Sequence, residues 1–426
     1  MTARDSLATV QRSMGDPSFT HPLWPPLTQG CPATSTAELA YPLEVDYAYD
    51  QYEECDQYDY AARSAGLDRW APLLPPLAAP GLGEGHTPLI PIGGVADREV
   101  YVKDESRNPT WSHKDRLNRC TVSAAVGVGA PGIVVASSGN HGASAAAYAA
   151  RAGLRCVVLA SADMPAAVDA FLNSYGAVVL PVPQEARWPL MRQIGDRLGL
   201  HPVSNLTVTH TGHPFGPEGY KTIAYEIFAD IGVPAAVFVP TGYGECLFGI
   251  WKGFAELRRL GLSGTVPRMF ACEPAAGGPL AAAVRRGVPA ARVSCGPTDA
   301  YGIACEVGGY RGVRAVRESG GGALLVTDRQ LREAQQELAR QGIWAELSGA
   351  ASLAGLRSLP DGNAAKGPDG STAKGPDAST LDGPVVCLST SSGFKDRAVG
   401  TRTASEVIEP TWEEAYRRLR AAGLEA

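Results

Sequence analysis

Short apolar runs alternate with longer amphipathic stretches along most of the chain after residue 84. The apolar runs are rich in Val, Ile and Ala, and Gly132–Ala136 is a clear example. Runs of this kind are typical of strands that are buried on both faces of a parallel sheet. We expect strands at Val100–Lys103, Gly132–Ala136, Cys156–Leu159, Ala177–Pro181, Ala235–Val239, Met269–Cys272, Leu324–Thr327 and Val385–Leu388.

The stretches between these runs are rich in alanine or repeat apolar residues with the spacing of a helix. Helices are therefore expected at Asp115–Val126, Ala143–Arg151, Pro217–Asp230, Leu247–Leu260 and Asp328–Gln341. Regular alternation of strand and helix predicts an α/β architecture with mostly parallel sheets.

Two segments fall outside this pattern. Residues 1–80 form an N-terminal extension, in which tyrosines alternate with acidic residues from Tyr41 to Tyr60. Charge runs are usually solvated, so we expect an acidic, partly flexible arm; the alternative is an arm that docks on a partner or a neighbouring subunit. The insert at 360–383 repeats Ala-Lys-Gly-Pro-Asp, and its composition predicts a disordered surface loop.

Composition narrows the class of protein. The chain is 45% hydrophobic and 19% charged, with a net charge of -6, which predicts a globular protein with no general attraction to nucleic acid or acidic membranes. The nine cysteines include no Cys-x-x-Cys pair, which indicates reduced thiols, a cytoplasmic location and no metal site. Neither a signal peptide nor a run long enough to span a membrane is evident.

A lysine stands at the start of an expected helix, where α/β proteins place their ligands. Lys114 lies in Asn108-Pro-Thr-Trp-Ser-His-Lys-Asp-Arg116, between an expected strand and an expected helix. The field of a helix N-terminus favours a free amine, which is the form that condenses with an aldehyde. Taken alone, the segment is also compatible with a solvated lysine.

Three more segments follow expected strands. Ser137-Ser-Gly-Asn-His-Gly142 offers hydroxyls and backbone N–H groups that suit a substrate carboxylate, or it is an ordinary helix cap. Thr241-Gly-Tyr-Gly-Glu-Cys246 has glycines that let backbone N–H groups approach a phosphate. Leu388-Ser-Thr-Ser-Ser-Gly-Phe-Lys-Asp396 places a hydroxyl at a strand end, where it could bond a ring nitrogen.

In order and context these segments resemble the threonine synthase family, which belongs to the fold-type II enzymes that use pyridoxal 5′-phosphate (PLP). The similarity spans roughly residues 65–400 apart from the insert, and its segments are Leu82–Leu89, Asn108–Arg116, Ser137–Gly142, Glu218–Glu226, Thr241–Phe254 and Thr390–Asp396. The resemblance implies two doubly wound domains. The large PLP-binding domain would comprise 81–130 and 206–426, and the small domain 131–205 would contain the Ser-Ser-Gly-Asn loop.

The resemblance also implies residue roles. Lys114 would form the internal aldimine with PLP and shuttle the Cα proton, while Asn140 would face the 3′-oxygen of the cofactor. Thr390 would meet the pyridine nitrogen and leave the ring unprotonated, which favours elimination and replacement over transamination. The phosphate loop would comprise Gly242, Tyr243, Gly244, Glu245 and Cys246. The substrate-binding residues would be Ser112, His113, Ser137, Ser138, Gly139 and His141.

Four departures from the family pattern affect the site. Trp111 replaces a glycine, and His113 replaces a phenylalanine; we interpret His113 as a packing residue, with an acid–base group as the alternative. Glu245 would lie beside the cofactor phosphate, which is unfavourable unless its side chain points away. A lysine often present in the family is missing from Asp169–Asn173, which weakens the case for O-phosphohomoserine as substrate.

The resemblance implies a PLP-dependent lyase that acts by elimination and replacement on an amino acid such as O-phosphohomoserine. It also implies a cytoplasmic homodimer without nucleic-acid or membrane partners. The Ser-Ser-Gly-Asn-His-Gly form is similar to serine/threonine dehydratases, so deamination, or β-replacement on a serine derivative, is an alternative. A third possibility is a degenerate, non-catalytic homologue that acts as a partner or regulator.

Overall fold

The computed structural model describes residues 6–52, 60–95, 98–359, 380–397, 399 and 407–424. Residues 1–396 form one compact unit and residues 397–426 a second, so the end of the chain is separate from the domain to which the sequence assigned it. The second unit contains helix α11 (Trp412–Ala421), which the Thr411 side chain caps. Most of the expected loop at 360–383 lies outside the described residues.

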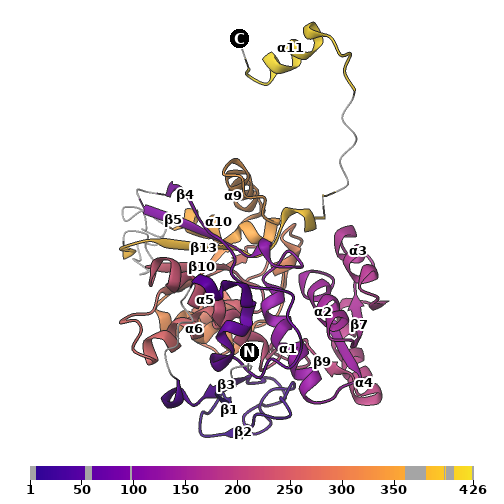
Figure 1. Ribbon diagram of the computed structural model, residues 1–426, viewed down its shortest axis with the longest axis vertical. Coiled ribbons are helices and arrows are strands. Elements are labelled where there is room, and N and C mark those ends of the chain that lie inside the picture. Colours follow the sequence, from indigo (N-terminus) through magenta and orange to yellow (C-terminus); the bar gives the residue numbers. More distant parts are fainter. Residues whose placement is uncertain are drawn as a thin grey trace. The chain divides into compact units, whose positions relative to one another are not determined.

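The larger sheet of the first unit has six strands in the order β12-β11-β10-β13-β5-β4 (Figure 1). All neighbours are parallel except β4 and β5, which are antiparallel. The strands are β4 (Leu89–Val95), β5 (Arg98–Asp104), β10 (Ala236–Pro240), β11 (Arg268–Pro274), β12 (Gly322–Val326) and β13 (Val385–Ser389). The expected strands of this sheet are confirmed, and β4 is an addition.

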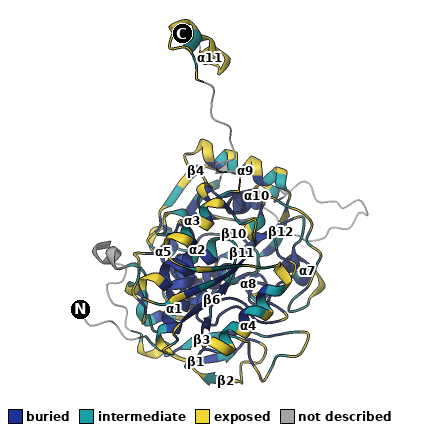
Figure 2. Ribbon diagram, turned by 90° about the vertical axis from the view of Figure 1, so that its right-hand side faces the viewer, coloured by how far each residue is buried: buried dark blue, intermediate teal, exposed yellow. Residues whose placement is uncertain are grey.

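Helices cover both faces of this sheet. Val237 and Val239 of β10 pack into a core with α5 (Gly216–Ile231), α6 (Glu245–Arg259), α7 (Pro279–Arg286) and α8 (Tyr310–Ser319). The alternate residues Ala236 and Phe238 pack into a second core with α9 (Asp328–Arg340) and α10 (Ala351–Ser358). Alternation along a strand that is apolar throughout therefore supplies two cores, as expected for a doubly wound sheet (Figure 2).

The smaller sheet has four parallel strands in the order β8-β7-β6-β9. They are β6 (Gly132–Ala136), β7 (Arg155–Ala160), β8 (Val178–Pro181) and β9 (His201–Pro202). One face packs on α1 (Lys114–Gly127), α2 (Asn140–Arg151) and α3 (Ala166–Ser174), and the other packs on α4 (Arg187–Leu198). The segments of the two sheets match the expected large and small domains.

The N-terminal extension contains a three-stranded antiparallel sheet of β1 (Ala8–Ser13), β2 (Thr20–Pro22) and β3 (Leu43–Tyr47). The expectation of a solvated arm is wrong for β3, because Tyr47 is 4% exposed. The Tyr47 hydroxyl donates to Glu218 at 2.9 Å, and Lys252 Nζ donates to the Val45 carbonyl at 2.6 Å. The strand therefore docks on α5 and α6 of its own chain.

Short 3₁₀ segments connect the main elements at Tyr49–Gln51, Tyr60–Leu73, Glu105–Arg107, Gln184–Ala186, Tyr301–Ile303, Leu347–Ala350 and Gly393–Lys395. Among the described helices, none is long and apolar enough to cross a membrane. The eight cysteines that lie in the described residues are free thiols.

Candidate functional site

The loop before α1 is joined to the loop after β13. The backbone N–H of His113 donates to the Thr390 carbonyl at 3.0 Å, and Ser112 forms an isolated bridge with Ser391. Ser112 also caps the following helix, because its Oγ accepts from the Lys114 N–H at 3.3 Å. These contacts place Lys114 at the carboxyl end of the larger sheet, where open α/β sheets bind ligands.

Lys114 has a neutral partner. Its Nζ donates to the Tyr220 hydroxyl at 3.1 Å, and within the described part of the chain no carboxylate lies within 4.0 Å of this amine. Tyr220 lies on α5 and is fully buried, and burial raises the pKa of its phenol well above the ordinary value. A phenol that stays neutral positions the amine without pairing with its charge. Tyr220 lies in the segment Glu218–Glu226, but its own role was not predicted from the sequence.

His113 is a buried packing residue. Its ring stacks on Tyr220 with centroids 5.5 Å apart, and its Nδ1 lies 3.0 Å from the Thr390 carbonyl oxygen. Burial, and then the charge of Lys114, lower the pKa of His113 well below the ordinary value. The ring is therefore neutral, and its Nδ1–H donates to the carbonyl. This geometry supports the packing interpretation over the acid–base alternative.

Asn140 begins α2, and its side chain is held at both ends. Nδ2 donates to Glu346 Oε2 at 2.7 Å, and Oδ1 accepts from Ser391 Oγ at 3.1 Å. Glu346 is buried, and burial raises the pKa of its carboxyl group. The sequence analysis missed both partners. The signal for Glu346 is a single acidic residue inside the otherwise apolar run 343–347.

The Ser137–Gly142 segment leaves the first turn of α2 open. Ser137 Oγ accepts from the Gly139 N–H at 3.2 Å, and Ser138 Oγ accepts from the Ser161 N–H at 2.6 Å. The hydroxyls thus fix the loop, and no side chain caps α2. Burial, and then Lys114, lower the pKa of His141 to about 3. Backbone N–H groups and a neutral imidazole are suitable donors for a carboxylate.

The expected phosphate loop leads into α6 through a glycine that cannot be replaced easily. Gly244 has φ +86°, and a Cβ atom at this position would lie 2.8 Å from Gly312 Cα. No side chain caps α6, so its first N–H groups are open to a ligand. Next to Gly244, the Tyr243 ring stacks on His210 at 4.0 Å, and Cys246 is buried. Gly242 is packed closely, since a Cβ there would lie 3.0 Å from Cys305 Sγ.

Glu245 has a cation beside it. Its carboxylate lies 3.7 Å from Arg311 Nη1 and 3.9 Å from His210 Nε2. The side chain packs against the backbone of Gly212, where a Cβ atom would lie 2.0 Å from Glu245 Oε1. Burial raises the pKa of Glu245, although Arg311 and Lys114 act in the opposite direction. Both the cation and the raised pKa reduce the repulsion that Glu245 would exert on a phosphate.

Several buried polar atoms at these segments lack a hydrogen-bond partner among the described residues. They include His141 Nε2, Glu346 Oε1, Glu245 Oε1 and Ser389 Oγ. Buried polar atoms are almost always satisfied, so a polar ligand is expected here. The open start of α6, the amine of Lys114 and the hydroxyl of Thr390 fit the phosphate, the aldehyde and the ring nitrogen of the cofactor that the sequence implies.

Aromatic side chains from both domains meet near this site. The Trp111 ring lies 5.3 Å from that of Phe171 on α3 and 5.6 Å from that of Phe394. Trp111 is 41% exposed and has a φ of +62°, which is unusual for a residue other than glycine. The departure from the family's glycine therefore has a structural consequence for the backbone.

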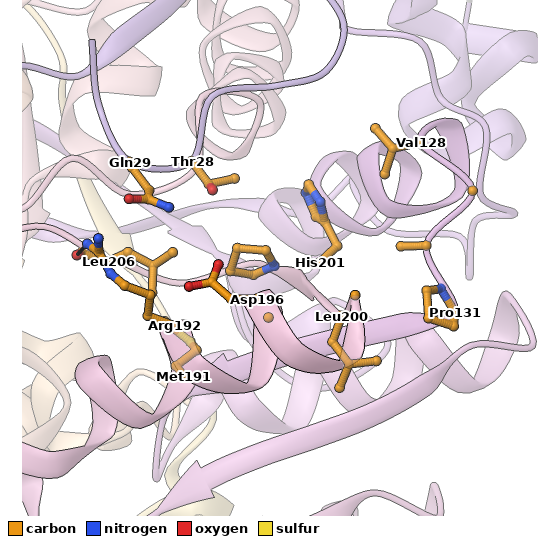
Figure 3. Close-up of a pocket in the computed structure, with 15 residues that line it drawn as sticks. Thr28, Gln29, Val128, Pro131, Met191, Arg192, Asp196, Leu200, His201 and Leu206 are labelled. Carbon is orange, nitrogen blue, oxygen red and sulfur yellow. Dashed lines mark hydrogen bonds between the residues drawn. The ribbon is translucent and has the colours of Figure 1, made fainter. Parts of the chain in front are cut away.

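A separate cavity of about 340 Å³ lies between α4, the α1–β6 turn and the N-terminal segment (Figure 3). Thr28 and Gln29 contribute from the N-terminal segment, and Arg192 and Asp196 contribute from α4. Lys114, Asn140 and the α6 loop are not among its lining residues. This cavity is therefore distinct from the candidate site.

Comparisons with known proteins agree with this geometry. The model of the family described as pyridoxal-phosphate dependent enzyme matches residues 81–370. Threonine synthase of Methanosarcina acetivorans is 33% identical over 333 residues, covering 75% of this chain and 80% of that protein. Threonine synthase of Methanocaldococcus jannaschii is 31% identical over 391 residues, covering 88% and 92%.

Two solved structures are similar in fold. Maize serine racemase matches with a TM-score of 0.61 at 18% identity, covering 80% of this chain and 94% of that chain. A bacterial threonine deaminase, from the source abbreviated T.th., matches with a TM-score of 0.59 at 23% identity, covering 76% and 94%. Identities at this level concern the fold alone.

Proposed function

Because the chain belongs to the pyridoxal-phosphate-dependent enzymes of fold type II, as a threonine synthase-like lyase, we propose that it eliminates a leaving group from an amino acid such as O-phosphohomoserine and replaces it with a nucleophile. The non-catalytic alternative is set aside, since the family is that of a PLP-dependent lyase. The observation on which the proposal rests most is the Lys114 amine, held by the neutral Tyr220 beside Asn140.

The cofactor supplies an aldehyde that condenses with amines and a conjugated ring that withdraws electrons from Cα. We propose that the first N–H groups of α6, from Glu245 onward, hold its phosphate, with Gly242 and Gly244 shaping the loop. Asn140 and Thr390 would orient its ring from opposite segments. Thr390 presents a neutral hydroxyl, which suits elimination rather than transamination.

Lys114 would remove the Cα proton and return it during the reaction. Tyr220 keeps the amine in place, since the hydrogen bond fixes Nζ at 3.1 Å from the phenol oxygen. The substrate carboxylate would bind the open first turn of α2, next to Ser137, Ser138 and His141. His113 would act by packing, since its neutral ring is bonded to the Thr390 carbonyl.

A second candidate is deamination of a hydroxy amino acid. It is favoured by the imidazole of His141, which lies in the carboxylate loop with Nε2 buried and, among the described residues, unpartnered. The two reactions differ in their products, because elimination and replacement on a phosphate ester release phosphate, whereas deamination releases ammonia.

The visible absorption spectrum of the purified protein tests the proposal. With PLP added, we expect a band that Lys114→Ala abolishes and that O-phosphohomoserine shifts with release of phosphate. A shift by L-serine or L-threonine with release of ammonia would instead support the second candidate. Absence of any Lys114-dependent band would contradict both.

A further inference from the structure

Arg187 opens α4 at the carboxyl end of the smaller sheet. It follows β8, while the Ser137–Gly142 loop follows β6 and the 161–165 loop follows β7. These three strands are parallel, so the three loops lie at one edge of the sheet. Arg187 therefore lies at the same edge as the loop proposed to bind the substrate carboxylate.

The guanidinium of Arg187 is buried without a counter-charge. The residue is 9% exposed, and its Nε atom is buried with no hydrogen-bond partner. Across the described ranges no residue forms a hydrogen bond or an ion pair within 4.0 Å with this side chain. Burial lowers the pKa of Arg187, while Tyr243 and Asp163 raise it from a greater distance.

Other buried arginines of this chain are paired. Arg116 binds Glu105 at 2.7 Å and Glu226 at 2.6 Å, and Arg311 Nη2 donates to the Leu43 carbonyl at 2.6 Å. A buried cation without a partner costs several kcal/mol, so proteins rarely keep one that has no anion to bind. The contrast indicates that the anion for Arg187 comes from outside the chain.

Arg187 also faces the second domain. Tyr243, which influences its pKa, belongs to the loop that opens α6. The Trp188 ring, next along the chain, lies 6.5 Å from the Tyr243 ring. The cation thus lies between the substrate edge of the small sheet and the phosphate loop of the large one.

We propose that Arg187 binds an anionic group at the far end of the substrate side chain, a phosphate ester or a carboxylate, and so selects amino acids that carry one. This inference rests on the proposed function. The cofactor phosphate already has the open start of α6 in the large domain, whereas Arg187 belongs to the domain with the carboxylate loop. Arg187 would also supply a cation that Asp169–Asn173 lacks.

Calorimetric titration of the PLP-loaded protein with two unreactive amino acids tests the inference. L-2-amino-5-phosphonopentanoate carries a distal phosphonate, and L-norvaline has the same carbon chain without it. We expect the wild type to prefer the phosphonate by about tenfold or more, as for a charge-assisted contact. Arg187→Gln should remove this preference, leave norvaline affinity within about twofold and leave PLP affinity unchanged. Arg187→Lys should retain part of it.

Arg192→Gln is the matched control. Arg192 lies on the same helix but lines the separate cavity, and it donates to the Leu206 carbonyl at 2.7 Å (Figure 3). This variant should keep the wild-type preference. Arg187→Gln is expected to fold, because it removes an unpaired buried charge, and its melting temperature should equal or exceed that of the wild type.

The other outcomes separate the two proposals. Equal affinity of the wild type for both amino acids would overturn the role of Arg187 and leave the proposed function standing. Loss of PLP affinity in Arg187→Gln would assign the arginine to the cofactor phosphate and also overturn it. If neither amino acid binds the loaded wild type, the proposed function fails and the inference fails with it.

Discussion

The side-chain amide of Asn140 donates a hydrogen bond of 2.7 Å to the carboxylate of Glu346. Because Ser391 Oγ donates to the other end of the same amide, the nitrogen and oxygen of Asn140 cannot exchange places without losing both bonds. Glu346 Oε1 has no hydrogen-bond partner within the described ranges. The orientation of Asn140 is therefore obtained by burying a carboxylate that is only partly satisfied.

We predict opposite effects of Glu346→Gln on stability and on catalysis. Burial raises the pKa of Glu346, so the folded state disfavours the charged form, and its stability falls as the pH rises above the ordinary carboxyl range. Glutamine stays neutral, so the variant should gain thermal stability relative to the wild type at pH 8 more than at pH 5. Melting curves at both values measure this difference.

The catalytic effect of the same variant should be a loss of about tenfold in kcat/KM, because a glutamine amide can present either a donor or an acceptor to Asn140. Asp396 and Lys395 also act on Glu346, so Asp396→Asn serves as a control for the surrounding field. An identical pH dependence of stability in the variant and the wild type would contradict the assignment.

Tyr220→Phe should leave the PLP band present but lower kcat. The substitution removes the hydroxyl that accepts from the Lys114 amine at 3.1 Å and keeps the ring that stacks on His113. We expect a loss of about ten- to a hundredfold in kcat, the range typical of a lost contact to a proton-transferring group. Stopped-flow measurement of Cα deuterium exchange would detect the defect at the proton-transfer step, and wild-type exchange in the variant would argue against this role.

The sequence allowed the parallel strands to be predicted because a strand buried on both faces is apolar throughout, as in β6 and β10. It did not reveal β3, whose burial depends on partners distant in sequence. Its acidic and aromatic side chains resemble a solvated charge run until Tyr47 is placed against Glu218 on α5. Local composition carries no information about such pairing.

The candidate site shows the same division. Lys114, Asn140 and the α6 loop stand in local segments that have a recognisable order, so the sequence could name them. Glu346 and Arg187 act through contacts between domains, and neither lies in a motif. They become visible only as buried charges, one partly satisfied and the other unpaired, once the fold is known.

Acid stability should depend on the contact between the N-terminal strand and α5. Burial alone would raise the pKa of Glu218, but Lys221 and Lys252 lower it to about 2. A carboxyl group with a lowered pKa in the folded state adds stability above its ordinary value of 4.5, and this stability is lost as the pH falls from there towards 2.

Glu218→Gln should therefore flatten the decline of stability between pH 5 and pH 2, while lowering stability at pH 7 by roughly 3 kcal/mol or more. Tyr47→Phe, which removes only the 2.9 Å bond to Glu218, should cost about 1 kcal/mol at pH 7. Urea unfolding at a series of pH values measures both. A parallel decline in Glu218→Gln and the wild type would show that other groups control acid unfolding.

The backbone at Trp111 should be strained, and two variants separate this strain from the packing of the ring. Trp111→Ala and Trp111→Gly both remove the contacts with Phe171 and Phe394. Only glycine adopts a φ of +62° without steric cost, so Trp111→Gly should be more stable than Trp111→Ala by about 1 kcal/mol. Chemical denaturation of the two variants measures this difference directly. Equal stabilities would mean that the chain relaxes at this position once the ring is gone, and that the tryptophan itself imposes the left-handed conformation three residues before Lys114.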